Sequence, residues 1–411
     1  MLFNYIEKHI LPLLFVVAVI IDVINGYIQL SLHHETLIGI LFRGGIWLFF
    51  LLSVSQYVSI IMKLLIGLFI TISCLIFWYL VYDAPIFIEL DNLVRLSYVF
   101  VLFSFFYMNR QYYDKTNLYK YIMIYGCIIA CVIILCFIFD IGYSSYGKED
   151  NQYGWGTTGF FIAQNDLSLT FVCSLIISCI YYNYSRSTIA FAGLFFIGIG
   201  AVLIGTRVCF FFIPLILLIE SYYIFKQKGN YIHKLILSIN IAIIIPVIAF
   251  LIYVALDEYA LAKLTIESIG NARVGLVDYG KEYITSLEGF SLLIGEGVGN
   301  FRYYIAKKMF YSQNYREVEA DYFDIVGSYG YLLGLVVLSF YLYFLYKSIV
   351  LYLNNKNSET FFMVILFFLY AFIGCLAGHA ATNVMAAPIY ALSANIVLRY
   401  RNENRIVILG T

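Results

Sequence analysis

The chain is poor in charged residues: Asp, Glu, Lys and Arg make up 12% of its 411 residues, against about 25% in a soluble globular domain. Its 25 basic and 25 acidic residues cancel. The sequence therefore lacks the basic excess of a nucleic-acid-binding protein and the net charge of a disordered acidic chain. Hydrophobic residues make up 63%, more than a soluble fold of this size can bury. This composition predicts a polytopic membrane protein with no nucleic-acid partner.

The sequence also lacks cysteine patterns that indicate disulfides or metal binding. All eight cysteines lie inside apolar runs, with no Cys-x-x-Cys pair and no Cys/His cluster at zinc spacing. We interpret them as small buried hydrophobic residues. The isolated string His33-His34-Glu35 has no second cluster to complete a metal site, so we interpret it as a solvated turn. No metal and no cofactor are expected.

Long apolar runs fill most of the sequence. A membrane-spanning helix needs about 20 mainly apolar residues, and by this criterion the sequence predicts about twelve spans. The predicted spans cover residues 10–30, 36–53, 60–82, 90–108, 118–140, 158–182, 188–206, 208–225, 232–256, 323–350, 360–380 and 383–399. The expected fold class is an all-α polytopic integral membrane protein with about 12 transmembrane helices.

Basic residues between the predicted spans lie mainly on one side. If the N-terminus is inside, fourteen Lys and Arg residues flank the cytoplasmic ends of the spans, and the short external loops carry only Lys148 and Arg207. The positive-inside rule then predicts that both termini are cytoplasmic. It divides the chain into residues 1–256 with nine spans, an external loop 257–322, and residues 323–411 with three spans and a short tail.

The external loop is long enough to carry function. Around Val274 and Val277, apolar residues recur at helical spacing with charged residues between them. This spacing predicts an amphipathic helix that can lie along the membrane surface.

Charged and polar residues inside the predicted spans gather toward the outer side. They are Asp22, Arg43, Arg95, Asn165, Asp166 and His379. Glu220 alone lies toward the cytoplasm, where its side chain is expected to reach the interface. Because intramembrane charges are costly, they indicate a functional site, and arginines favour a phosphate-bearing ligand. The alternative for each residue is that it pairs with another to hold helices together.

Four short strings mark the second half of the chain. They are Ile204-Gly205-Thr206-Arg207, Asn271-Ala272-Arg273, Ile294-Gly295-Glu296-Gly297-Val298-Gly299-Asn300, and the polar string from Glu319 to Gly334. On spacing alone, the glycine string is a flexible turn, and the last string is a helix start whose acidic residues suit the helix dipole.

Taken in order, these strings resemble the bacterial O-antigen polymerase and O-antigen ligase superfamily. That family has a Gly-Thr-Arg turn, a large external loop opened by an arginine, a Gly-x-Gly-x-Gly-Asn string and a polar re-entry string containing a Tyr-Gly pair. Gly378-His379 and the stretch Gly159-Phe160-Phe161 with Gln164-Asn165 resemble further strings of the family. The resemblance covers residues 155–390.

The resemblance implies a GT-C-like glycosyltransferase of the bacterial inner membrane, with its active site facing the periplasm or exterior. Such an enzyme is metal-independent and inverting, and its donor is a polyprenyl-diphosphate-linked oligosaccharide. A polymerase transfers the growing glycan onto the next lipid-linked repeat unit of an O-antigen, capsule or exopolysaccharide. Membrane lipids and a chain-length regulator protein are the other partners implied. Ligases carry a histidine before the re-entry helix, where this chain has Glu319 and Asp321, so a polymerase is favoured over a ligase.

The same resemblance suggests roles for individual residues. Arg207 and Arg273 match the two family arginines and would neutralise the leaving diphosphate. Further candidates for binding substrate are Arg43, Arg95, Asn165 and Asp166. The acceptor hydroxyl needs a base, for which Asp321 and Glu319 rank above His379 by position.

Three other functions fit a polytopic protein. A flippase for lipid-linked oligosaccharides would also carry arginines in a cavity, but its charges should extend toward both faces, and this sequence shows no repeat symmetry. A membrane O-acyltransferase would need a buried histidine reached from the cytoplasm. A structural anchor would not need intramembrane charges.

Overall fold

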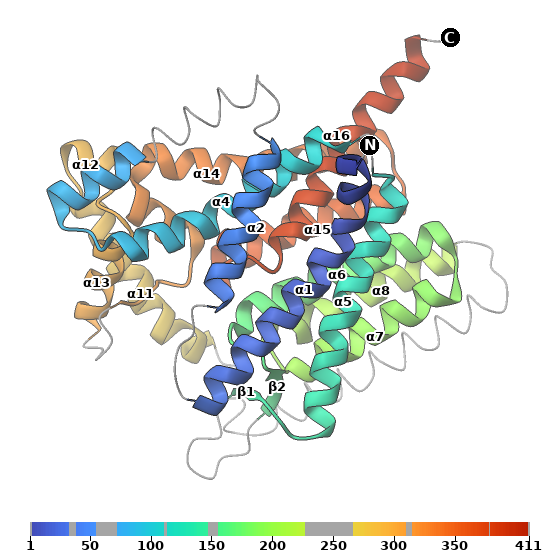
Figure 1. The fold of residues 1–411 in the computed structure, drawn as a ribbon, viewed down its shortest axis with the longest axis horizontal. Coiled ribbons are helices and arrows are strands. Elements are labelled where there is room, and N and C mark those ends of the chain that lie inside the picture. The colour runs from blue at the N-terminus through green and yellow to red at the C-terminus, as the bar shows by residue number, and fades with distance from the viewer. Residues whose placement is uncertain are drawn as a thin grey trace.

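The computed structural model describes residues 2–32, 38–54, 72–110, 113–146, 155–226, 266–309, 315–377 and 379–409, which are mostly helical (Figure 1). The helices are α1 (Leu2–Leu32), α2 (Ile38–Val54), α4 (Ile86–Met108), α5 (Lys115–Ile138), α6 (Gln164–Ser185), α7 (Thr188–Ile204), α8 (Arg207–Lys226), α11 (Ile266–Ser286), α12 (Gly289–Ile294), α13 (Val298–Lys308), α14 (Asp321–Asn354), α15 (Ser358–Ala377) and α16 (Ala387–Leu409), with a further helical segment Ile72–Tyr82. The strands are β1 (Tyr143–Tyr146) and β2 (Trp155–Gly159). The predicted span 232–256 lies outside the described residues, and the span 60–82 is described only from residue 72.

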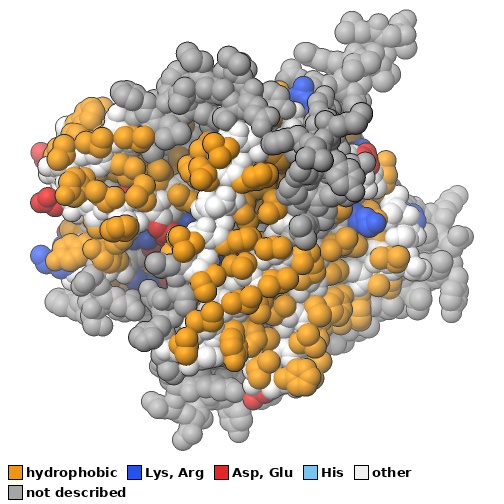
Figure 2. Space-filling model, in the orientation of Figure 1, with side chains coloured by type: hydrophobic (Ala, Val, Ile, Leu, Met, Phe, Trp, Pro, Cys, Tyr) orange, Lys and Arg blue, Asp and Glu red, His pale blue; other side chains and the backbone are white. Residues whose placement is uncertain are grey.

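Five of the described helices are long and apolar enough to cross a membrane. They are Leu14–Leu32, Lys115–Ile138, Gln164–Ser185, Val208–Lys226 and Asp321–Asn354. Figure 2 shows hydrophobic side chains spread over one face of the molecule, and Ile20 and Ile24 of α1 and Phe137 and Ile138 of α5 are among the exposed residues. An extended exposed apolar surface indicates contact with lipid or protein. The fold is that of an all-α membrane-embedded protein, as the composition predicts.

Small residues allow the central helices to approach closely. A Cβ atom added at Gly126 of α5 would lie 2.8 Å from Cβ of Ser174 in α6. At Gly200 of α7 it would lie 2.8 Å from Cβ of Ala130 in α5. Close contact at small residues is a common way to pack helices in membranes. It makes α5, α6 and α7 a tight unit in which most of α6 is buried.

A short β-hairpin precedes α6, where the sequence predicts a span from residue 158. Strand β1 pairs antiparallel with β2, and α6 begins only at Gln164. Gly156 has φ of +70°, and a Cβ there would lie 2.2 Å from the carbonyl oxygen of Ile204. The same carbonyl accepts a hydrogen bond from the Ser145 hydroxyl. The hairpin is therefore packed against the turn between α7 and α8.

The external segment folds around its own small core. Helices α11, α12 and α13 lie together at the left of Figure 1, beside α4 and α14. The buried side chains of this core are Leu276, Tyr283, Leu287, Phe301, Ile305, Val318 and Ala320. The apolar side of α11 is thus covered by α13 and by the segment that leads into α14.

Candidate functional site

Glu317 lies at the centre of a cluster formed where the external segment re-enters the helical body. One of its carboxylate oxygens pairs with the guanidinium of Arg302 on α13. The other lies 3.0 Å from Nδ1 of His379, which follows α15 rather than lying inside it. A single carboxylate therefore joins two cationic side chains from segments far apart in the sequence.

The contact fixes the charge state of both partners. Burial lowers the pKa of His379, but the hydrogen bond to Glu317 and the Glu317 charge raise it more strongly, to about 9. Burial raises the pKa of Glu317, while the hydrogen bond from His379 and the charge of Arg302 lower it well below its usual range. Both groups are therefore ionised at neutral pH.

Two aspartates in the first turn of α14 hold the neighbouring loops. Oδ2 of Asp321 accepts a hydrogen bond from the backbone N–H of Ala381 at 2.9 Å. The carboxylate of Asp324 accepts from the backbone N–H groups of Val318 at 2.9 Å and Ala320 at 3.1 Å. Asp321 thereby positions the loop that carries His379, and Asp324 positions the segment that carries Glu317.

These groups line a small pocket. Asn92 of α4 closes one side, because its amide donates to the Tyr329 hydroxyl at 2.8 Å and accepts from Arg302 at 3.0 Å. Asp321, which is 7% exposed, lines the same pocket as His379. The pocket therefore places a buried carboxylate, an imidazolium and a guanidinium around one space, a set suited to proton transfer at a bound hydroxyl.

The glycine string from Ile294 to Asn300 fixes the position of α13, which carries Arg302. Both oxygens of the buried Glu89 carboxylate accept backbone hydrogen bonds at the start of α13, from Val298 at 3.0 Å and Gly299 at 2.7 Å. A helix N-terminus commonly binds a phosphate, but here an internal carboxylate occupies that position. Gly295 and Gly330, both with positive φ, pack backbone against backbone between this string and α14. The string is a packing turn that fixes α13 and hence Arg302.

The start of α6 lies between this pocket and two other parts of the predicted site: the intramembrane arginines and the turn that carries Arg207. The backbone carbonyl of Asp166 accepts from the side chain of Asn383 at 2.9 Å, and the Asp166 carboxylate lies within electrostatic range of His379, Arg43 and Arg95. Two residues later, the Ser168 hydroxyl lies 2.8 Å from the Thr206 hydroxyl.

The turn between α7 and α8, which carries Arg207, forms because Gly205 ends one helix and Thr206 caps the next. Gly205 ends α7 in the left-handed conformation, with φ of +73°, which favours glycine. The Thr206 hydroxyl accepts from the backbone N–H of Cys209 and so caps α8. Arg207 follows as the first residue of α8, next to the start of α6.

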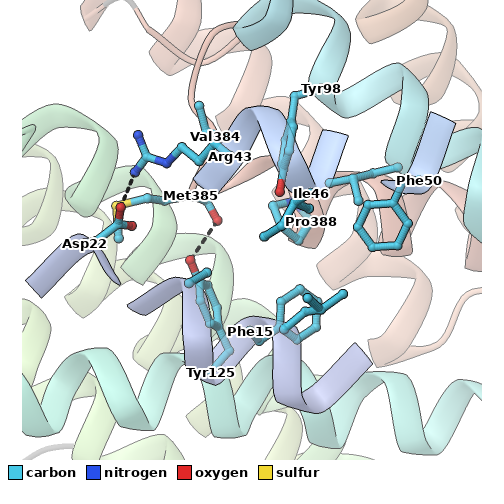
Figure 3. A pocket seen from close by; sticks show the side chains of 13 residues that line it. Phe15, Asp22, Arg43, Ile46, Phe50, Tyr98, Tyr125, Val384, Met385 and Pro388 are labelled. Carbon is cyan, nitrogen blue, oxygen red and sulfur yellow. Dashed lines mark hydrogen bonds and ion pairs between the residues drawn. The ribbon is translucent and has the colours of Figure 1, made fainter. Parts of the chain in front are cut away.

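A second pocket lies beside the first and is shown in Figure 3. Arg43 of α2 pairs with Asp22 of α1 at 2.6 Å, and Tyr98 of α4 lines the same space. Arg95, one turn before Tyr98, pairs with Asp91 at 2.9 Å. The pair between Arg43 and Asp22 joins α1 to α2. It is a contact of the kind that the sequence analysis gives as the alternative to ligand binding, in which charged residues hold helices together.

The structure thus gathers most of the predicted site residues. Asp321 and His379 line one pocket, and Asp166 links them to Arg43 and Arg95. Asn165 lies beside Asp166 in the first turn of α6. Glu319 has φ of +63° and pairs with Arg316 at 2.6 Å.

Some predicted residues lie outside this set or outside the described part. Arg207 begins α8 and Arg273 lies in α11, but their side chains lie outside the described residues, as do Gly378 and the string 33–35. The expectation that Glu220 reaches the interface is wrong: its side chain is fully buried, and its carboxylate accepts from the amide of Asn183 at 2.7 and 2.9 Å.

The sequence reasoning missed Glu317, Arg302 and Asn92. Glu317 lies two residues before Glu319, the first residue of the polar re-entry string, so its nearness to that string was the available signal. Within the described ranges, no group of three His, Cys, Asp or Glu residues is arranged to hold a metal ion.

No protein-family model matches the chain, and no curated protein matches it. Its relation to the O-antigen polymerase and ligase superfamily therefore stays a prediction from the motifs.

Proposed function

We propose that the chain polymerises lipid-linked oligosaccharide repeat units of an O-antigen, capsule or exopolysaccharide. It would transfer a glycan from polyprenyl diphosphate onto the next lipid-linked repeat unit at the outer face of the bacterial inner membrane. One observation carries the proposal: a buried carboxylate, Asp321, shares a pocket with the Glu317–His379 pair where the external helices meet the membrane helices. The re-entry string, one of the motifs that resemble the polymerase family, contributes Asp321, Ser328 and Tyr329 to the lining of that pocket.

The reaction needs one base and one stabilised leaving group. The acceptor hydroxyl oxygen attacks the anomeric carbon of the donor sugar, and the bond between that carbon and the diphosphate oxygen breaks. The electron pair of the broken bond leaves with the lipid diphosphate, and the hydroxyl proton passes to the base. A single displacement of this kind inverts the anomeric centre. No metal takes part in this scheme.

Asp321 is the base in this proposal. Its carboxylate accepts a hydrogen bond from the backbone N–H of Ala381 and interacts with the backbone of His379 and Ala380, which holds it in place at the wall of the pocket. Glu319 suits the role less well, because its carboxylate pairs with Arg316. A base must lie within hydrogen-bond reach of the proton it accepts, and the pocket position of Asp321 meets that need.

His379 serves the leaving group. Glu317 occupies Nδ1 of the imidazolium and leaves Nε2–H as a donor toward a diphosphate oxygen. Arg207 and Arg273 would supply the remaining positive charge, since cations placed where negative charge develops lower the barrier. Glu317 is a positioning residue that keeps His379 protonated.

The proposal is tested in a strain that lacks the gene. We would compare its surface glycan after complementation with the intact chain, Asp321→Asn, His379→Gln and the control Glu282→Gln, with membrane levels of each protein measured. Glu282 is an exposed residue of α11 that pairs with Lys308 at 2.7 Å. The intact chain and the control should restore a ladder of polymer lengths, and the two site variants should leave single repeat units. A full ladder from Asp321→Asn would overturn the assignment of the base.

A further inference from the structure

Helix α12 exposes large apolar side chains although it belongs to the external segment. Its six residues, Gly-Phe-Ser-Leu-Leu-Ile, include no charged side chain. Phe290, Leu292 and Leu293 are 58%, 38% and 44% exposed, whereas Ser291 and Ile294 are buried. The apolar side of the longer helix α11 is covered by α13. The exposed residues of α12 therefore form an apolar face that the rest of the external segment does not cover.

This face continues the apolar surface of two neighbouring helices. Phe290 contacts Phe77 of the helical segment Ile72–Tyr82, with ring centroids 5.3 Å apart, and α12 also packs against α14. Both neighbours expose apolar side chains, which are Tyr79, Leu80 and Val81 in the first and Leu332, Leu335 and Val336 in the second. Figure 2 shows hydrophobic side chains at the upper left, where Figure 1 places α12. Since α14 is long and apolar enough to cross a membrane, the face of α12 adjoins a surface that is suited to lipid.

A break in α14 indicates the depth at which α12 lies. The backbone of α14 is not helical at Gly330. The turn that ends α12 packs into this break, since a Cβ added at Gly295 would lie 2.1 Å from the carbonyl oxygen of Ser328. From Gly330 to Asn354, where α14 ends, the helix rises about 36 Å at about 1.5 Å per residue, a little more than the hydrocarbon core of about 30 Å. The end of α12 therefore lies near the boundary of that core.

The backbone around this turn is paired in the way that contact with lipid requires. The N–H of Gly295 donates to the carbonyl of Ser291 at 2.7 Å, and its carbonyl accepts from the indole N–H of Trp78 at 3.1 Å. The N–H of Gly297 donates to the carbonyl of Ser328 at 3.1 Å. These groups find their partners within the protein, so the turn can lie beside acyl chains without leaving them unpaired.

We propose that α12 lies in the membrane boundary on the side of the external segment, with Phe290, Leu292 and Leu293 among lipid acyl chains. Acyl chains fit this face better than a protein partner does, because the face is uncharged and is continuous with the apolar surface on both sides. A protein interface would carry a polar rim around such a patch. The turn after α12 leads directly into α13, which carries Arg302. Contact of α12 with lipid therefore holds the candidate site at the membrane surface.

Tryptophan fluorescence of the full chain in phosphatidylcholine nanodiscs, with one chain in each disc, tests the inference. Phe290→Trp and Leu293→Trp each place an indole on the proposed face. The matched control is Lys281→Trp, at an exposed position of α11. The three native tryptophans are measured in the intact chain, and their emission is subtracted. Each variant is then titrated with acrylamide in water and is also measured in discs whose acyl chains carry bromine.

The added indole in Phe290→Trp and in Leu293→Trp should emit at shorter wavelength than in Lys281→Trp. Brominated chains should quench it, and acrylamide should have little effect, whereas the control should show the reverse. Strong quenching by acrylamide in both α12 variants would overturn the inference, because the face would then lie in water. Protection from both quenchers would also overturn it, because protein would then cover the face.

A second variant links the contact to the position of the site. Phe290→Ser combined with Leu293→Ser should loosen the external segment and speed its proteolysis in the same discs. Thr285→Ser, a mild change at an exposed position of α11, should leave proteolysis unchanged. Equal proteolysis of the double variant and the intact chain would contradict the anchoring role. None of these measurements needs turnover, so the inference can hold in a chain that makes no polymer, and failure of either leaves the other to be judged separately.

Discussion

Replacing Glu317 with glutamine tests the charge state of the candidate site. The intact pair holds the pKa of His379 at about 9, against an ordinary value of 6.5. At pH 7.5 this corresponds to about thirty protonated His379 side chains for each neutral one. In Glu317→Gln the two largest contributions that raise the pKa of His379 are removed, while burial, which lowers it, and the charges of Asp166 and Asp324, which raise it, remain. The pKa of His379 should therefore fall toward its ordinary value of 6.5, and the protonated fraction at pH 7.5 should fall with it.

The titration can be followed by NMR of histidine-labelled protein, because the chain has only five histidines and His379→Gln identifies the signal. The glutamine oxygen can still accept a hydrogen bond from Arg302, and its amide N–H can donate to Nδ1 of a neutral His379, so the loop should keep its place. We expect the His379 signal to titrate near pH 9 in the intact chain and at a clearly lower pH in Glu317→Gln. The control Glu282→Gln should titrate like the intact chain.

Polymer formation should follow the same titration. The intact chain should keep its rate as the pH rises toward 9 and lose it above, because His379 then loses its proton. Glu317→Gln should lose its rate at a lower pH than the intact chain does. A rate that instead rises as the pH passes through 9 would mean that neutral His379 acts as the base. Identical titrations of the intact chain and Glu317→Gln would refute the reasoning.

Three further predictions concern stability. Since the folded-state pKa of His379 is raised, its pairing with Glu317 stabilises the fold fully below pH 6.5, and this stabilisation is lost as the pH rises through 9. Thermal denaturation in detergent should show the loss in the intact chain and not in Glu317→Gln. A loss of equal size in both proteins would contradict the prediction. Glu89→Ala leaves the buried N–H groups of Val298 and Gly299 unpaired, which lowers stability by about 1–3 kcal/mol for each group. We expect faster proteolysis within residues 289–309. Unchanged proteolysis would count against the capping role of Glu89. Gly330→Ala forces a side chain onto a backbone with φ of +67° and a Cβ within 2.5 Å of the Gly295 nitrogen, so the free energy of unfolding should fall by more than about 2 kcal/mol, whereas Gly275→Ala, which has open space around it, should be tolerated.

Apolar runs predicted the membrane helices because burial in lipid depends on local composition. Helices α5, α6 and α8 coincide closely with predicted spans, since a run of about 20 apolar residues leaves few alternatives. The hairpin before α6 was not predicted. Its strands are only four and five residues long, and its place depends on a contact with the turn after α7, which no local pattern encodes.

The same difference between local pattern and folded contact separates the site residues that the sequence predicts from those that it misses. Asp321 and His379 stood out in the sequence because polar residues are rare next to apolar runs. Glu317 and Arg302 lie in the external segment, where charged residues are common, and their importance comes from a contact made only in the folded chain. Glu319 and Glu317 are indistinguishable by position, but the backbone turns Glu319 toward Arg316 and leaves Glu317 with His379.

The most direct test of the central claim is to identify what accumulates when the gene is deleted. The account predicts single repeat units linked to polyprenyl diphosphate at the outer face of the membrane, reached by a membrane-impermeant glycosidase. It also predicts that the intact chain converts them to polymer, while Arg207→Ala and Arg273→Ala do not. Accumulation of the same units at the cytoplasmic face, protected from the glycosidase, would identify a flippase and contradict the assignment of a transferase site.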